Sequence, residues 1–119
     1  MRGNVVIAFI CAGLIACATS TSNVAGHYYW GAEVESFQPC GSENSYWVVG
    51  DTTVLQPLRD KAADLIRRKE PYSAVFVMAN APLEPKATDG FAAEYDGVYR
   101  FNEVTHVNEV SPSGCLPHR

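Results

Sequence analysis

The side chains with the greatest capacity for chemistry are four cysteines, at positions 11, 17, 40 and 115, and three histidines. A cysteine sulfur can be acylated, can form a disulfide or can bind a metal ion. The compartment decides between these outcomes, because disulfides persist only where the surroundings are oxidising. The segment around Cys17 carries the information about the compartment.

Cys17 follows a short apolar segment. Val5 to Ala16 reads VVIAFICAGLIA, which contains no charge. Twelve helical residues span about 18 Å, which is too short for a bilayer core of roughly 30 Å but typical of a signal peptide. Leu14-Ile15-Ala16-Cys17 has the order of a bacterial lipobox: a branched apolar residue, a tolerant position, a small residue and a cysteine. Cys11 does not fit, because the bulky Ile10 precedes it.

We therefore expect residues 1–16 to be a lipoprotein signal peptide and Cys17 to carry the lipid. The alternatives are an ordinary secretory peptide or a buried N-terminal helix. Several acyl chains on one cysteine make a stable membrane anchor. By resemblance to the sorting of enterobacterial lipoproteins, Ala18 at the next position favours the outer membrane, facing the periplasm. Residues 17–25 would be the lipidated cysteine and a flexible tether of roughly 15 Å, and residues 26–119 one small domain.

Cys40 and Cys115 are the thiols that remain in an oxidising compartment once Cys11 is removed and Cys17 is acylated. We expect them to form a disulfide, which would close a loop of about 76 residues and contribute on the order of 4.5 kcal/mol. Two free thiols or one metal site are the alternatives. The chain has no CxxC or HxxxH spacing, so we predict no metal site.

The elements that must position these cysteines are mostly strands. The sequence predicts long bent strands over 26–38 and 95–110, shorter strands over 46–49 and 73–79, and an irregular edge over 81–91. One amphipathic helix starts at a Thr53–Gln56 capping box and ends before Pro71. Its apolar positions are Leu58, Ala62, Leu65 and Ile66. The predicted fold is mainly β with one helix: a small OB-like, five-stranded barrel with one disulfide.

The stretch YWGAEVESFQPCGSENSYWV, from Tyr29 to Val48, resembles the opening of the C-terminal OB domain of the NlpE family of copper-homeostasis and envelope-stress lipoproteins. The resemblance extends through Asp96-Gly97 to the late Cys115. It implies the OB fold, the cysteine pair and a role at the cell envelope, with no catalytic residue. The N-terminal CxxC domain of that family has no counterpart here, so the resemblance implies a module related to envelope stress or copper homeostasis without the functions of that N-terminal domain itself.

The sequence predicts no catalytic residues and no cofactor, and hence a protein that is not an enzyme. No GxSxG motif occurs, and His27, His106 and His118 are scattered. Glu33 and Glu35 lie two apart on one expected strand, and we interpret them as a solvated strand face rather than an acid–base pair.

Two kinds of ligand are disfavoured. His27, His106 and Met78 are of types that bind soft metals, but their spacing does not indicate a site. Removing residues 1–16 takes away Arg2 and changes the net charge from −4 to −5, which disfavours nucleic acid.

Two function classes remain. The first is an envelope module that contacts another envelope protein, with anchors such as the aromatic residues at 28–30 or 46–47. The second is a lipoprotein inhibitor of a muramidase-type hydrolase, acting through the loop over 81–90.

Overall fold

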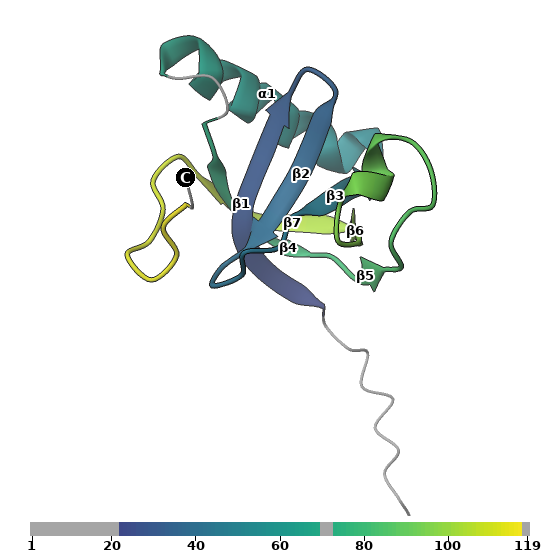
Figure 1. The fold of residues 1–119 in the computed structure, drawn as a ribbon. Coiled ribbons are helices and arrows are strands. Elements are labelled where there is room, and N and C mark those ends of the chain that lie inside the picture. The colour runs from purple at the N-terminus through teal and green to yellow at the C-terminus, as the bar shows by residue number, and fades with distance from the viewer. Residues whose placement is uncertain (1–21, 70–72, 118–119) are drawn as a thin grey trace, which may run out of the picture.

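The computed structural model describes residues 22–69 and 73–117 (Figure 1). The signal peptide, Cys17, most of the expected tether, Pro71 and His118 lie outside the described residues. No helix among the described residues is long and apolar enough to cross a membrane.

The described residues form one seven-stranded sheet and one α-helix, so the prediction of a mainly β fold with one helix is confirmed. The strands are β1 (Asn23–Gly31), β2 (Val34–Pro39), β3 (Tyr46–Gly50), β4 (Val75–Asn80), β5 (Leu83–Glu84), β6 (Val98–Phe101) and β7 (Glu103–Asn108). The helix α1 spans Thr52–Arg68, and a 3₁₀ turn, η1, spans Phe91–Glu94. The order in the sheet is β5-β6-β3-β2-β1-β4-β7, with β3 and β6 parallel. The predicted OB-like barrel had five strands, whereas the sheet has seven and is not closed.

The first expected long strand is a hairpin of two strands. β1 and β2 pair antiparallel from Gly26↔Pro39 to Gly31↔Val34, and only two residues connect them. The second of these, Glu33, has a φ of 59°, a left-handed conformation that is uncommon for residues other than glycine. The usual Asn-Gly or Asp-Gly signal of a two-residue hairpin is absent at this position, so the sequence predicts a bend within one strand and not a turn.

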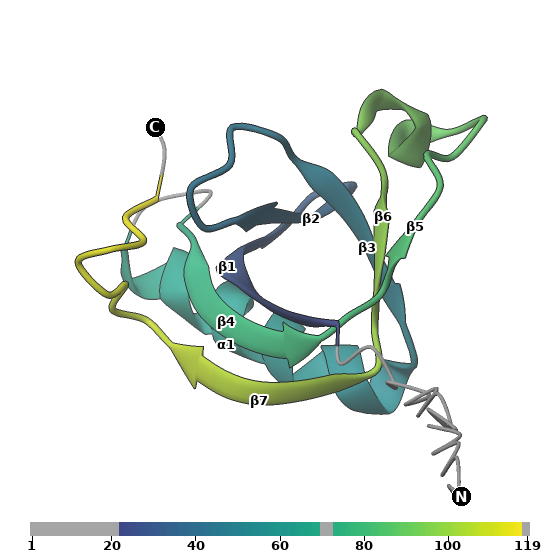
Figure 2. The same cartoon turned by 90° about the horizontal axis from the view of Figure 1, so that it is seen from below.

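The sheet has two further strands that the sequence did not predict. They arise because the chain is interrupted between β4 and β5 and between β6 and β7, and these two interruptions lie opposite each other. β4 and β5 are separated by Ala81 and Pro82, and β6 and β7 by Asn102 alone. The Asn102 amide donates to the Asn80 carbonyl, and the Arg100 amide to the Pro82 carbonyl, at 2.9 and 3.1 Å. The sheet therefore curls strongly around its interior (Figure 2).

The sheet also starts earlier than expected. β1 begins at Asn23 because Asn23 to Ala25 pair with β4, in the register Asn23↔Asn80 to Ala25↔Met78. These three residues belong to the domain rather than to a flexible tether, so the predicted boundary at Gly26 is wrong by three residues. A Cβ atom at Gly26 would lie 2.3 Å from the Gln38 carbonyl oxygen, so this close crossing of β1 and β2 requires glycine.

One buried cluster joins the inner face of the sheet to α1. Its large members are Tyr28, Phe37, Val48, Val75, Val77 and Phe101 of the sheet, and Leu55, Leu58 and Leu65 of the helix. Leu58, Ala62 and Leu65 confirm the predicted apolar face of α1. The predicted capping box is wrong: Asp51 is the N-cap residue, and the Gln56 amide donates to Asp60 instead.

Candidate functional site

The predicted disulfide is present. Cys40 follows β2, and Cys115 belongs to the C-terminal segment, by which we mean residues 109–117. The Cα atoms of the two cysteines are 5.1 Å apart, within the usual range for a disulfide. The amide of Cys40 donates to the Ala25 carbonyl at 2.9 Å, so the bond ties the C-terminal segment to the paired strands β1 and β2.

A buried histidine lies beside this disulfide. The His27 side chain is only 2 % exposed, and its Nδ1 lies 3.9 Å from the sulfur of Cys115. Its Nε2 and the Ser111 hydroxyl share a hydrogen bond of 2.8 Å. Because Ser111 and Cys115 both belong to the C-terminal segment, this segment covers His27 on the outer face of β1. The contacts of His27 therefore hold the C-terminal segment against β1.

A second polar cluster fixes α1 to the β1–β2 hairpin. Arg59 donates from Nε and from one terminal nitrogen to the two oxygens of Glu35, both at 2.8 Å, and the Tyr28 hydroxyl donates to Glu35 at 2.6 Å. The guanidinium of Arg59 also lies 4.9 Å from the centre of the Trp30 ring. Glu35 is buried, so the interpretation of this carboxylate as part of a solvated strand face is wrong.

The electrostatics of this cluster favour its paired form. Burial, followed by the hydrogen bond to Glu35, raises the pKa of Tyr28 far above its ordinary value. The hydrogen bond to Glu35 likewise raises the pKa of Arg59, although burial opposes it. Both oxygens of Glu35 are engaged by neighbours, whereas a general base needs an oxygen directed toward a substrate. The arrangement is that of a structural ion pair.

The residues considered as metal ligands do not converge. His106 of β7 lies directly opposite Met78 of β4, but the Phe76 ring lies between the two histidines, with centroids 6.1 Å from His27 and 5.9 Å from His106. Within residues 22–69 and 73–117, no group of three His, Cys, Asp or Glu side chains is arranged to hold a metal ion.

The aromatic residues considered as anchors are largely covered. Tyr28 belongs to the core, and the others are half-buried. The Tyr46 ring packs edge-on to Tyr99 at 4.8 Å, and Trp47 packs on Tyr95 at 5.3 Å. These rings support the connection between β5 and β6 rather than forming a binding surface themselves.

Two of the large apolar residues that are exposed lie on the long connection that includes β5 and η1; the others among the described residues are Met78, Val107, Val110 and Leu116. Leu83 is 56 % exposed and Phe91 is 58 % exposed. Lys86, on the loop between them, is also exposed. The sequence analysis missed Leu83 and Phe91. Their signal was the placement of two large apolar residues at the two ends of a polar segment that contains Pro85 and Gly90.

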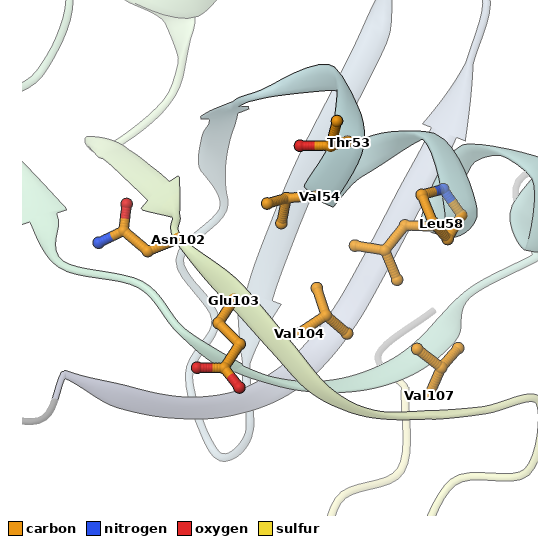
Figure 3. Close-up of a pocket in the computed structure, with 8 residues that line it drawn as sticks. Thr53, Val54, Leu58, Asn102, Glu103, Val104 and Val107 are labelled. Carbon is orange, nitrogen blue, oxygen red and sulfur yellow. The ribbon is translucent and has the colours of Figure 1, made fainter.

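An apolar groove lies between α1 and β7. Thr53, Val54, Pro57 and Leu58 form its helix side, and Asn102, Glu103, Val104 and Val107 form its strand side. Figure 3 shows the valines and Leu58 facing one another across the groove, with Asn102 and Val107 toward opposite ends. Its volume is about 360 Å³. We call this feature the α1–β7 groove.

Comparison of the chain with models of protein families, with curated proteins and with solved structures found no match. The functional interpretation therefore rests on the surfaces and contacts of the described residues.

Proposed function

We propose that this protein is a non-enzymatic, lipid-anchored module of the bacterial envelope that works by binding another envelope protein. The observation that carries the proposal is the exposure of Leu83 and Phe91 on one connection of the sheet. Exposed apolar side chains that gather into one patch on a folded domain mark contact sites for other proteins. We call this surface, which comprises residues 83–95, the β5–η1 surface.

The residues that adjoin the β5–η1 surface are held in place by hydrogen bonds and close packing, and this supports a binding role. The Asp96 amide donates to the Ser45 carbonyl, and the Ser45 amide donates to the Asp96 carboxylate, at 2.9 and 3.1 Å. A Cβ atom at Gly97 would lie 3.2 Å from the Tyr46 ring and 3.3 Å from Leu83, so the packing leaves little free space. A surface held in one conformation loses less entropy when it binds.

The proposed place of action is the outer membrane, facing the periplasm, through a lipid on Cys17. It is supported by the lipobox Leu14–Cys17, by the apolar segment of signal-peptide length before it, and by the Cys40–Cys115 disulfide, which suits an oxidising compartment. A role in envelope stress or copper homeostasis is the finer proposal, and it rests on the resemblance to NlpE-type domains.

The anchor is tested by mass spectrometry of protein from the membrane fraction. We expect a mature chain that begins at an acylated Cys17, and we expect Cys17→Ser to be uncleaved or misplaced. A mature chain that begins at another residue, or that carries an unmodified Cys17, would contradict the anchor.

The binding role is tested by affinity capture with the mature protein in detergent. We expect Leu83→Asp combined with Phe91→Asp to abolish recovery of a partner from envelope extract. Val110→Asp is the matched control, because Val110 is 70 % exposed and lies outside the β5–η1 surface. Equal recovery with the wild type and the double variant would contradict the proposed surface.

A second candidate is inhibition of a muramidase-type hydrolase, and the exposed Lys86 favours it. A basic side chain on a protruding loop could enter an acidic active-site cleft. If this candidate is right, the purified protein inhibits muramidase and Lys86→Ala weakens the inhibition. An absence of inhibition by the wild type would eliminate it.

A further inference from the structure

β7 ends the order of strands on one side of the sheet, and within the described residues only β4 pairs with it. Thr105 and His106 are exposed, and Val107 is 36 % exposed. Edge strands are commonly protected from pairing with another chain by lysine, proline or a bulge. β7 contains no lysine and no proline. It does contain a bulge, whose geometry decides which side chains share a face.

The bulge places two valines of β7 on the same face. Met78 pairs with His106, and the next residue, Ala79, pairs with Val104, so Thr105 is the extra residue. Directly opposed residues of an antiparallel pair point to the same side of the sheet. Val104 and Val107 therefore share the side of Ala79 and Val77, both of which are buried, and both valines line the α1–β7 groove.

We infer that two copies of this chain associate through β7, as an antiparallel pair of edge strands that extends the sheet across a two-fold axis. In the register that centres the axis between Thr105 and His106, Val104 lies opposite Val107 of the second copy. Thr105 then lies opposite His106, and Glu103 opposite Asn108. The strand is thus complementary to itself over all six of its residues.

This register keeps the two faces of the strand apart. Shifting the second strand by one residue places Val107 opposite Glu103, which sets an apolar side chain of one face against a charged side chain of the other. A one-residue slip moves side chains to the wrong face, so the register is strongly specified wherever one face is apolar. The bulge, which in other edges discourages pairing, here creates the matched pattern.

The charges around the strand are compatible with this pairing. Glu103 meets an uncharged Asn108 of the second copy, and like charges do not face each other within the six-residue strand. Glu109, just beyond β7, is engaged within its own chain by Arg68 and by Lys61. Like charges placed directly opposite each other would destabilise the pair, and the proposed register avoids them.

The α1–β7 groove supplies the apolar contact that edge pairing alone would lack. Val54 and Leu58 of α1 line the groove beside Val104 and Val107. The valines of the second strand extend this apolar row across the axis, and the same contact is made twice because the interface is symmetric. A second copy therefore matches both the backbone edge and the groove. The inference does not depend on the lipid anchor or on the β5–η1 surface.

The first test is sedimentation of the mature protein in detergent over a range of concentrations. We expect a monomer–dimer equilibrium, and we expect Val107→Lys to raise the dimer dissociation constant by about tenfold or more. Val110→Lys is the control, because it adds the same charge at an exposed position outside β7 and should leave the equilibrium unchanged. Thermal unfolding of both variants at low concentration verifies that each one folds.

The second test addresses the register. Thr105→Cys protein mixed with His106→Cys protein should form an intermolecular disulfide under mild oxidation, faster than either variant does alone, because the register places these positions opposite each other. The wild type remaining a monomer up to about 1 mM would overturn the inference. So would a dimer that is insensitive to Val107→Lys and that forms no preferred cross-link.

Discussion

Two regions of this domain are held to the sheet by different kinds of interaction. The helix α1 is fixed by an apolar face and by the polar cluster in which Tyr28 and Glu35 are buried and Arg59 and Trp30 are half-buried. The C-terminal segment has few apolar contacts, because Val110 and Leu116 are 70 % and 65 % exposed. It depends on the disulfide, on the hydrogen bond between Ser111 and His27, and on surface ion pairs of Glu109 with α1.

The stability of this small domain is therefore distributed unevenly between α1 and the C-terminal segment. The helix has several independent attachments, so the loss of one contact weakens the whole fold without releasing α1 alone. The C-terminal segment has few attachments, so the loss of the disulfide should release it locally as well as lower global stability. Cooperative and local unfolding are thus expected in different parts of one domain.

The largest effect is expected on removal of the disulfide. Replacing Cys40 and Cys115 by serine should lower the free energy of unfolding by about 4 kcal/mol, because the bond closes a loop across most of the domain. Urea unfolding measures this loss. In the folded variant, amide hydrogen exchange should become fast in residues 109–117 and stay slow in α1.

Chemical reduction of the wild type is the control for the serine substitutions, and it should reproduce both effects. If exchange became equally fast in α1 and in the C-terminal segment under native conditions, the proposed difference between the two regions would be wrong.

The next largest effect is expected at Glu35. Glu35→Ala should cost about 3 kcal/mol, because it leaves the buried Tyr28 hydroxyl and the guanidinium of Arg59 without their acceptor. Unlike loss of the disulfide, it should not accelerate exchange in the C-terminal segment alone. Glu33→Ala, in the adjacent exposed turn, should change stability little.

A double-mutant cycle sharpens this prediction. Arg59→Met added to Glu35→Ala should cost less than the sum of the two single changes, because the second substitution removes a cation that the first has left unpaired. Additive losses would show that Glu35 and Arg59 do not stabilise the fold as a pair.

A smaller effect is expected at Ser111. Ser111→Ala removes the hydrogen bond to the buried His27 and should lower the free energy of unfolding by about 1 kcal/mol. Ser113→Ala is matched in chemistry and lies two residues away at an exposed position, so it should have no effect. Equal unfolding midpoints for the two variants would mean that the hydrogen bond contributes nothing to holding the segment.

The same two regions show what the sequence could and could not predict. The apolar face of α1 was predictable, because its period is local and Leu58, Ala62 and Leu65 repeat at helical spacing. The disulfide was predictable because the other two cysteines were assigned elsewhere. The Glu35–Arg59 pair was not predictable, since the two residues are 24 positions apart and no local period links them.

The breaks between strands could not be predicted from the sequence for a related reason. A two-residue turn at Glu33 and a single-residue break at Asn102 carry no strong turn signal, so each pair of strands looked like one long strand. Which strand forms the edge of the sheet depends on pairing between distant segments. The α1–β7 groove, which follows from that pairing, was therefore out of reach of the sequence alone.

The smallest effect concerns Glu109, where the C-terminal segment begins and meets α1. Desolvation acts to raise the pKa of Glu109, but the hydrogen bond from Arg68 and the charges of Arg68 and Lys61 outweigh it, so the pKa lies below its ordinary value of 4.5. A carboxylate whose pKa is lower in the folded state adds stability above its unfolded pKa and loses that contribution as the pH falls through the folded pKa. Glu109→Gln should therefore be slightly less stable than the wild type at pH 7, and the difference should vanish in acid. Because the ion pairs are at the surface, added salt at pH 7 should reduce the difference as well. Urea unfolding of both proteins at neutral and acidic pH tests this, and a difference that persists in acid would show that Glu109 acts through packing instead of charge.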